Sequence, residues 1–151
     1  MPRGGAAVAL LQPLANLIEP GLRTDFVRFG ARRPAHVVSQ SPDKSAIALA
    51  VDSHVNSRHR EHPESGCSVA TLGSELAREN SAARHQMSEN VKGWLETLAQ
   101  FAPGSNAAEK MRAATGTYAA MIGGLIIARA VEDPHLSDRI LADVREFLNE
   151  T

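Results

Sequence analysis

The stretch at residues 118–131, YAAMIGGLIIARAV, decides the fold of this chain of 151 residues. Apolar side chains occupy nearly every side of a helix wound from it, and a helix that is apolar all round must be covered all round. The stretch therefore predicts a core helix, which we expect to run from about 106 to 131. The pair Gly123-Gly124 costs about 1 kcal/mol per residue relative to alanine inside a helix, which indicates that another element packs closely there.

Four other segments carry helical signals. Apolar residues recur within them at steps of three and four, and Asn80 and Ser81 are candidate N-caps. The segment 57–65, SRHREHPES, is expected to be a charged connector. No run alternates as a strand does, and no internal repeat is present, so the sequence predicts an all-α fold, a helical bundle of about five main helices. The other expected helices are 43–55, 67–78, 81–101 and 134–149.

The chain changes character near residue 42. Residues 1–42 hold five of the eight prolines and a net charge of +3, whereas residues 43–151 carry a net charge of −4. The first segment has no sustained periodicity, so we expect a weakly structured, irregular N-terminal arm over 1–42 and a helical domain over 43–151. The arginines of the arm either contact phosphates or are solvated, and the loop-like sequence around them favours solvation.

Composition and motifs exclude several classes of protein. The overall net charge of −1 is unsuited to binding nucleic acid over the whole surface. Cys67 is the single cysteine, so an intrachain disulfide is impossible, and the common nucleotide-binding, zinc-protease and nucleophile motifs are missing. We expect no enzyme activity, no metal and no cofactor. The longest uncharged stretch, 113–128, is shorter than the roughly 20 residues of a membrane span. We therefore expect a cytoplasmic protein without membrane association.

Two groups of side chains admit a functional interpretation and a structural one. His54, His59 and His62 could bind a metal ion, but no cysteine or carboxylate completes a site at their spacing, so we expect them to connect the surrounding helices. Cys67 could sense oxidants, but a small residue at a helix start is expected to be buried packing.

Two stretches of the chain together resemble a known family. The first, HVNSRHREHPESGCSVATLGSELAREN at 54–80, is similar to the beginning of the C-terminal regulatory domain of TetR-type transcriptional repressors. The second, MIGGLIIARAVEDPHLSDRILADVREFL at 121–148, is similar to a stretch near the C-terminus of the same family. The resemblance covers roughly 43–150. The family-motif residues are His59, Arg60, Pro63, Gly66, Cys67, Asp133 and Pro134.

The resemblance implies a helical, homodimeric, ligand-sensing domain. In the family, a small apolar or amphipathic effector enters between the helices and shifts their packing, which changes the spacing of two DNA-binding heads. The three-helix DNA-binding domain with which such proteins begin has no counterpart in residues 1–42. Site-specific DNA binding is therefore not expected from this chain alone. The alternative is a small helical interaction protein that dimerises without a small-molecule ligand.

Candidate ligand-binding residues lie on two of the expected helices. Met87, Val91 and Trp94 share a face of the helix at 81–101, and Tyr118 and Met121 lie on the central helix. Methionine adapts its shape to a ligand, and tryptophan and tyrosine each carry one polar tip, so these five residues are expected to line a pocket. The alternative is that they form ordinary core.

The last two expected helices supply the candidate dimer interface. Apolar residues recur on each at steps of three and four, so a two-fold axis would join two copies through a four-helix interface. The expected interface residues are Ile122, Leu125, Ile126, Arg129, Ile140, Val144, Phe147 and Leu148.

Overall fold

The computed structural model describes residues 45–150, apart from the side chain of Ser65. The arm expected over 1–42 and the helix start expected at 43 lie outside the described residues. Within the described part every regular element is helical, which confirms the predicted all-α fold. The elements are α4 (Ala46–His54), α5 (Ser57–Glu61), the 3-10 turn η1 (Pro63–Ser65), α6 (Ser68–Leu76), α7 (Ser81–Ala99), α8 (Ala107–Ala130) and α9 (Pro134–Glu150).

The five longest of these elements match the five predicted helices to within a few residues. The expected connector at 57–65 differs from the prediction, because it forms α5 and η1. Asn56 makes α5 possible, since its side-chain oxygen accepts a hydrogen bond from the His59 N–H at 2.9 Å. Pro63 then begins η1, where its fixed φ angle suits the first position of a helix.

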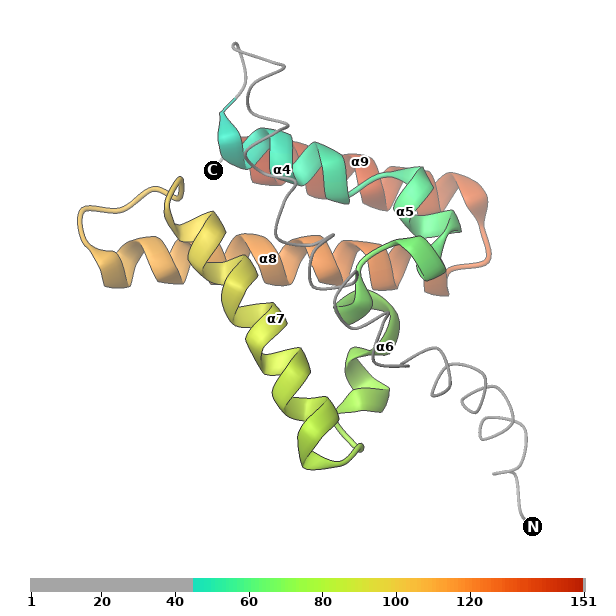
Figure 1. Cartoon of the computed structure of the whole chain (residues 1–151). Coiled ribbons are helices and arrows are strands. Elements are labelled where there is room, and N and C mark those ends of the chain that lie inside the picture. The colour runs from blue at the N-terminus through green and yellow to red at the C-terminus, as the bar shows by residue number, and fades with distance from the viewer. Residues whose placement is uncertain (1–44, 151) are drawn as a thin grey trace. The chain divides into compact units, whose positions relative to one another are not determined.

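Helix α8 lies at the centre of the described domain (Figure 1). Its main contacts are with α9 and α7, while α5 and α6 also pack against it and α4 packs against α9. Two apolar clusters form the core, and α8 contributes to both, as its all-round apolarity predicts. The first cluster contains Ala50, Cys67, Leu98, Ala102, Ala114, Tyr118 and Ile122. The second contains Val51, Val55, Met121, Leu125, Ala128, Leu141 and Leu148.

The Gly123-Gly124 pair has two different environments. A Cβ atom on Gly124 would lie 3.1 Å from Val144 Cγ1, so the missing side chain allows α9 to pack closely against α8. A Cβ atom on Gly123 would meet no described atom within 4 Å. The predicted close packing is therefore present at Gly124, whereas Gly123 faces open space.

The turn between α7 and α8 depends on Gly104. Its φ angle of 148° is one that residues with a side chain rarely adopt, and a Cβ atom there would lie 2.7 Å from the Lys110 nitrogen. After the turn, the side-chain oxygen of Asn106 accepts from the Glu109 N–H at 3.0 Å and so caps α8. The chain therefore reverses sharply between the two longest helices.

By length and composition, α8 is the one helix within residues 45–150 that could cross a membrane. Seven of its residues are buried by the protein itself, including Ala114, Met121 and Leu125, and it packs against both α7 and α9. Part of α8 is therefore covered by neighbouring helices of the same domain.

Candidate functional site

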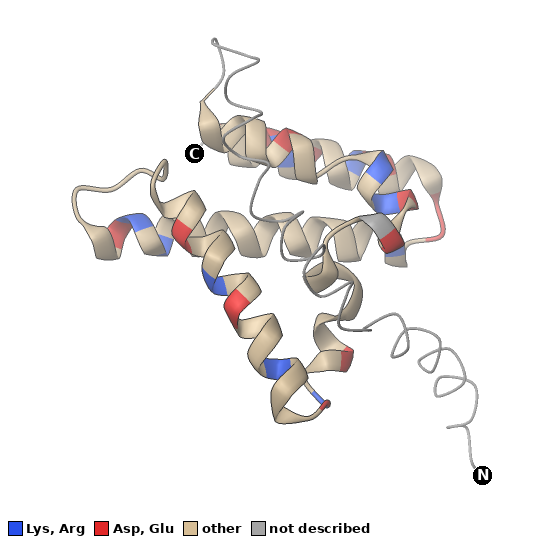
Figure 2. Ribbon diagram, viewed as in Figure 1, with Lys and Arg blue, Asp and Glu red and all other residues tan. Residues whose placement is uncertain are grey.

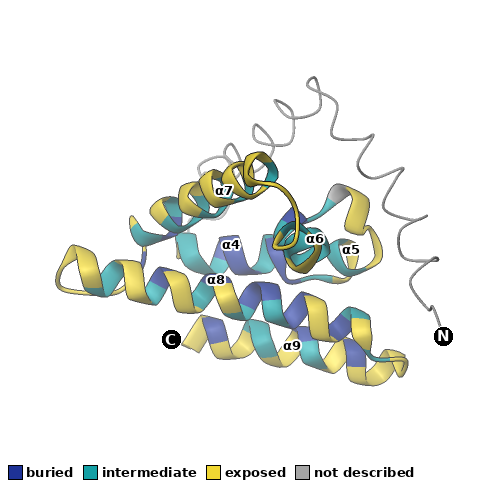
Figure 3. Ribbon diagram, turned by 90° about the horizontal axis from the view of Figure 1, so that it is seen from below, coloured by how far each residue is buried: buried dark blue, intermediate teal, exposed yellow. Residues whose placement is uncertain are grey.

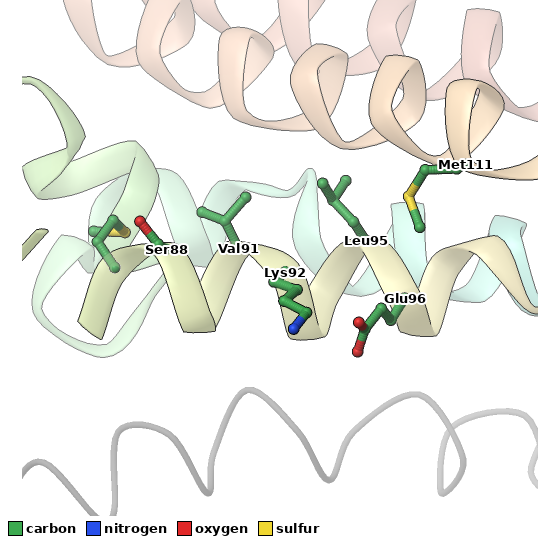
Figure 4. Close-up of a pocket in the computed structure, with 7 residues that line it drawn as sticks. Ser88, Val91, Lys92, Leu95, Glu96 and Met111 are labelled. Carbon is green, nitrogen blue, oxygen red and sulfur yellow. The ribbon is translucent and has the colours of Figure 1, made fainter. Parts of the chain in front are cut away.

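A groove lies between α7 and the beginning of α8 (Figure 4). It is open to solvent and has a volume of about 510 Å³, within the range of small-molecule sites. Apolar side chains make up most of its lining, and a hydroxyl, an ammonium and a carboxylate complete it. The lining residues are Met87, Val91, Leu95, Met111, Ser88, Lys92 and Glu96.

The five residues predicted to line a pocket are distributed over three places. Met87 and Val91 line the groove. Trp94 stacks on Tyr118, with ring centroids 6.1 Å apart and an interplanar angle of 16°, in the first core cluster. Met121 is fully buried in the second core cluster. The described structure thus forms two pairs from the predicted residues, leaves Met121 apart from both, and does not gather the five around one cavity.

The prediction missed five of the groove residues. Leu95 continues the row Met87-Val91-Leu95 at steps of four, so helical spacing alone could have identified it. Lys92 follows Val91 and Glu96 follows Leu95 in the sequence, and both lie at the edge of the groove. Met111 comes from α8, and its place in the groove depends on the turn at 100–106, which sequence spacing does not encode.

Aromatic rings from four helices, α4, α5, α7 and α8, meet beside the first core cluster. His54 of α4 meets the edge of Trp94 of α7 at a centroid distance of 5.6 Å, and Trp94 stacks on Tyr118 of α8. His54 also stacks on His59 at 5.1 Å. Two polar atoms in this group, His54 Nε2 and Tyr118 Oη, are buried without a hydrogen-bond partner. This group of rings therefore contains two buried polar atoms that form no hydrogen bond within the described residues.

Burial controls the protonation of this group. It lowers the pKa of His54 to about 4, with help from the nearby His59 and the positive charge of Arg129. It also raises the pKa of Tyr118, and the neighbouring Cys67 adds to that shift. Burial likewise raises the pKa of the Cys67 thiol. Near neutral pH the imidazole is neutral and the phenol and thiol keep their protons, so Cys67 has the environment of a packing residue and not of a reactive thiolate.

Two arginines join the two sequence stretches that carry the family resemblance. Arg129 of α8 donates from Nε to the Arg60 carbonyl at 3.2 Å and from Nη1 to the Ala70 carbonyl at 3.3 Å. It also donates to the His59 carbonyl and to the Thr71 hydroxyl. The carbonyls of His59 and Arg60 belong to the last turn of α5, where a helix lacks its own donors, so Arg129 caps that helix.

The second arginine, Arg60, belongs to the first stretch and donates hydrogen bonds to residues of the second. Arg60 of α5 donates from Nη1 to the Ser137 hydroxyl at 2.9 Å and to the Asp138 carboxylate at 2.5 Å, both in α9. Ser137 in turn donates to the carbonyl of Ala128 in α8. We call Arg60, Arg129 and the groups that they bind the arginine clasp. Charged residues of both signs gather around α5 and the turn between α8 and α9 (Figure 2).

The other family-motif residues shape the backbone on either side of the clasp. Pro63 begins η1, and a Cβ atom on Gly66 would lie 3.0 Å from the ring of His59. Asp133 caps α9, because its side chain accepts from the N–H at position 135 at 2.9 Å, and Pro134 is the first residue of that helix. Within residues 45–150, no cluster of histidine, cysteine and acidic side chains is arranged to hold a metal ion.

The residues predicted for a dimer interface fall into two groups. Leu125 is fully buried, Ile122 and Leu148 are nearly so, and Arg129 is engaged in the clasp, so the protomer already uses these four. Ile140 and Val144 are partly buried against the second core cluster. Exposed apolar residues do remain on α8 and α9, which lie side by side (Figure 3). They are Ile126, Ile127, Leu136 and Phe147, which we call the outer α8–α9 residues.

Comparisons with known protein families, with curated proteins and with solved structures find no match to this chain.

The clasp predicts that replacing Arg129 will be costly. Arg129→Gln removes most of the donors to the carbonyls of α5 and α6, so the free energy of unfolding is expected to fall by about 2–4 kcal/mol in urea denaturation. Arg139→Gln is the matched control, because the Arg139 side chain is 77% exposed and its pair within the described residues is with Asp143, at 3.4 Å. Equal effects of the two substitutions would contradict the clasp.

The buried imidazole predicts an acid-dependent loss of stability. The pKa of His54 is about 4 in the folded protein against 6.5 for an unperturbed histidine, so the unfolded chain takes up this proton first as the pH falls. The free energy of unfolding is therefore expected to fall by about 3 kcal/mol between pH 6.5 and 4 on account of this residue. Urea denaturation across that interval should show a smaller loss in His54→Phe than in the native protein. Gln86→Ala, at an exposed and non-titratable position of α7, should keep the native pH dependence.

Proposed function

We propose that this chain carries the ligand-sensing and dimerisation domain of a TetR-type transcriptional regulator. The observation that carries the proposal is the arginine clasp, because it joins the two stretches that resemble the family. Arg129 of the second stretch binds carbonyls of the first, and Arg60 of the first binds Ser137 and Asp138 of the second. The two stretches resemble the same family separately, and residues of one form hydrogen bonds with residues of the other. Together they support the proposal better than either resemblance does alone.

The groove supports the sensing part of the proposal. Its apolar floor and its charged edge, with Lys92 and Glu96, suit a small apolar or amphipathic effector. The effector would contact α7 and α8 at once, and α8 also carries two of the outer α8–α9 residues. Because a ligand shifts an equilibrium only by its difference in affinity for two states, the effector must favour one packing of α7 on α8 over another.

The outer α8–α9 residues support the dimerisation part. Ile126 and Ile127 are 46% and 53% exposed, and Leu136 adds a further apolar side chain on α9. Soluble monomers rarely leave a large apolar patch in water, and a two-fold axis lets one such patch meet its own copy. We therefore propose a homodimer in the cytoplasm, with no site-specific DNA binding by this chain alone.

A second candidate function is a small helical interaction protein that dimerises without a ligand. The position of Trp94 and Tyr118 favours it, because the two rings are stacked in the core and do not line the open groove. The two candidates share the dimer and differ in the response to small molecules.

The dimer is tested by charge substitution at exposed positions. Ile126→Asp and Ile127→Asp each place a carboxylate on the outer α8–α9 residues, where burial against a second copy would be unfavourable. Sedimentation velocity at micromolar concentration is expected to give a dimer for the native chain and a monomer for both variants, with unchanged helical circular dichroism. Glu89→Lys, at an exposed position of α7, should remain dimeric. A well-folded native monomer would exclude the dimer.

Ligand sensing is tested by a broad screen of small apolar and amphipathic molecules. Trp94 is the single tryptophan of the chain and lies one turn from groove residue Val91, so binding in the groove is expected to change its fluorescence. The same molecules should raise Tm in proportion to the logarithm of their concentration once binding saturates. Val91→Glu should abolish both responses. If a folded native protein responds to no compound, the second candidate function is favoured.

A further inference from the structure

Two buried polar atoms, one in the first core cluster and one on the neighbouring His54, have no hydrogen-bond partner among the described residues. The side chains of His54 and Tyr118 belong to residues that are only 6% and 5% exposed, and neither His54 Nε2 nor Tyr118 Oη makes a hydrogen bond. Leaving a buried polar atom unsatisfied costs about 1–3 kcal/mol, and most buried polar groups in folded proteins are therefore paired. The Cys67 thiol lies beside the Tyr118 hydroxyl and contributes to the raised pKa of that phenol.

The two atoms belong to one place in the fold. The imidazole of His54 and the phenol ring of Tyr118 both contact the indole of Trp94, so α4 and α8 meet α7 at this residue. Val91 and Leu95 lie on the same two turns of α7 as Trp94. They line the groove and also pack against the first core cluster, which contains Tyr118. One segment of α7 thus lines the groove and also contacts the two rings that carry the unsatisfied atoms.

The segment belongs to a helix that is anchored at one end. Leu98, near the end of α7, is the residue of this helix that is fully buried, whereas most residues between 81 and 90 are exposed. The clasp does not include α7, so a movement of Val91 and Leu95 that opens a passage from the groove to Trp94 would leave the clasp intact.

The chemistry of the two atoms defines what would satisfy them. The phenol of Tyr118 donates through its O–H, and a neutral imidazole donates through one of its two nitrogens. The guanidinium of Arg129 acts on both His54 and Cys67, so the surroundings are electropositive. An oxygen acceptor on a ring that stacks among Trp94, His54 and Tyr118 matches these features.

We propose that the groove is the outer half of a site whose inner half is the Trp94–His54–Tyr118 group, and that the whole site takes a small aromatic molecule with a hydroxyl or carbonyl oxygen. The ring displaces Val91 and Leu95 from the rings behind them, and its oxygen accepts from Tyr118 and His54. This inference rests on the proposed sensing function and names the class of effector.

The test compares two probes that differ by one oxygen, p-cresol and toluene, on the full chain. Each is titrated while the fluorescence of Trp94 and the Tm are recorded. One hydrogen bond that satisfies a buried group is worth about a five- to tenfold difference in affinity, so p-cresol is expected to bind at least fivefold more tightly than toluene. Both probes should perturb Trp94 in a saturable way.

Matched variants test whether the preference for p-cresol over toluene depends on Tyr118 Oη and His54 Nε2. Tyr118→Phe and His54→Phe each remove one unsatisfied atom and keep a ring, so both proteins should remain folded, with a Tm no lower than that of the native chain at neutral pH. Each is expected to reduce the preference for p-cresol toward that of toluene without weakening toluene binding. Glu89→Gln, at an exposed position of α7 outside the groove, should keep the native preference.

The outcomes separate this inference from the proposed function. Equal binding of the two probes, or a preference that survives in both Phe variants, would overturn the inference and leave ligand sensing intact. Failure of both probes to bind would overturn it as well, even if other compounds in the screen bind. A p-cresol preference that depends on Tyr118, in a chain that sediments as a monomer, would support the site and contradict the proposed dimeric regulator.

Discussion

The hydrogen bonds that Arg60 and Arg129 donate fix the relative positions of most of the described helices. Arg129 satisfies carbonyls at the end of α5, and Arg60 reaches Ser137 and Asp138 at the start of α9. Short helices such as α5 have little stability of their own, and a charged donor at their unsatisfied end compensates for that. The clasp therefore holds the α4–α6 segment against α8 and α9 at a point where apolar packing alone would leave several orientations open.

Helix α7 lies outside the clasp. It joins its neighbours through apolar contacts and through the hydrogen bond from Asn90 Nδ2 to the Ser68 hydroxyl at 3.2 Å. The domain thus combines a frame held by directional, charge-assisted bonds with one long helix held mainly by packing. Apolar packing tolerates small sliding movements better than a hydrogen-bond network does, so a shift of α7 against a fixed α8–α9 pair is the movement that this architecture permits at least cost.

Helix positions could be predicted from the sequence, because periodicity and caps are local properties. The cap at Asn80 and the central place of α8 are examples. The partner of each apolar residue could not be predicted in the same way. Leu125 and Ile126 are neighbours of equal apolarity, yet one is fully buried and the other is 46% exposed. The clasp could not be predicted from residue spacing either, since its hydrogen bonds join residues 58 to 78 positions apart. Only the family resemblance drew attention to these residues.

The caps of the helices have a consequence for the behaviour of the domain in salt and acid. Four of the helix starts are capped by neutral side chains, the hydroxyl of Ser45 and the amides of Asn56, Asn80 and Asn106. An amide or a hydroxyl gains no proton on mild acidification, and ions screen its hydrogen bond little. The start of α9 differs, because its cap is the carboxylate of Asp133. High ionic strength therefore weakens the capped starts of the helices unequally. It acts first on the start of α9 and on the Arg60–Asp138 ion pair beside it.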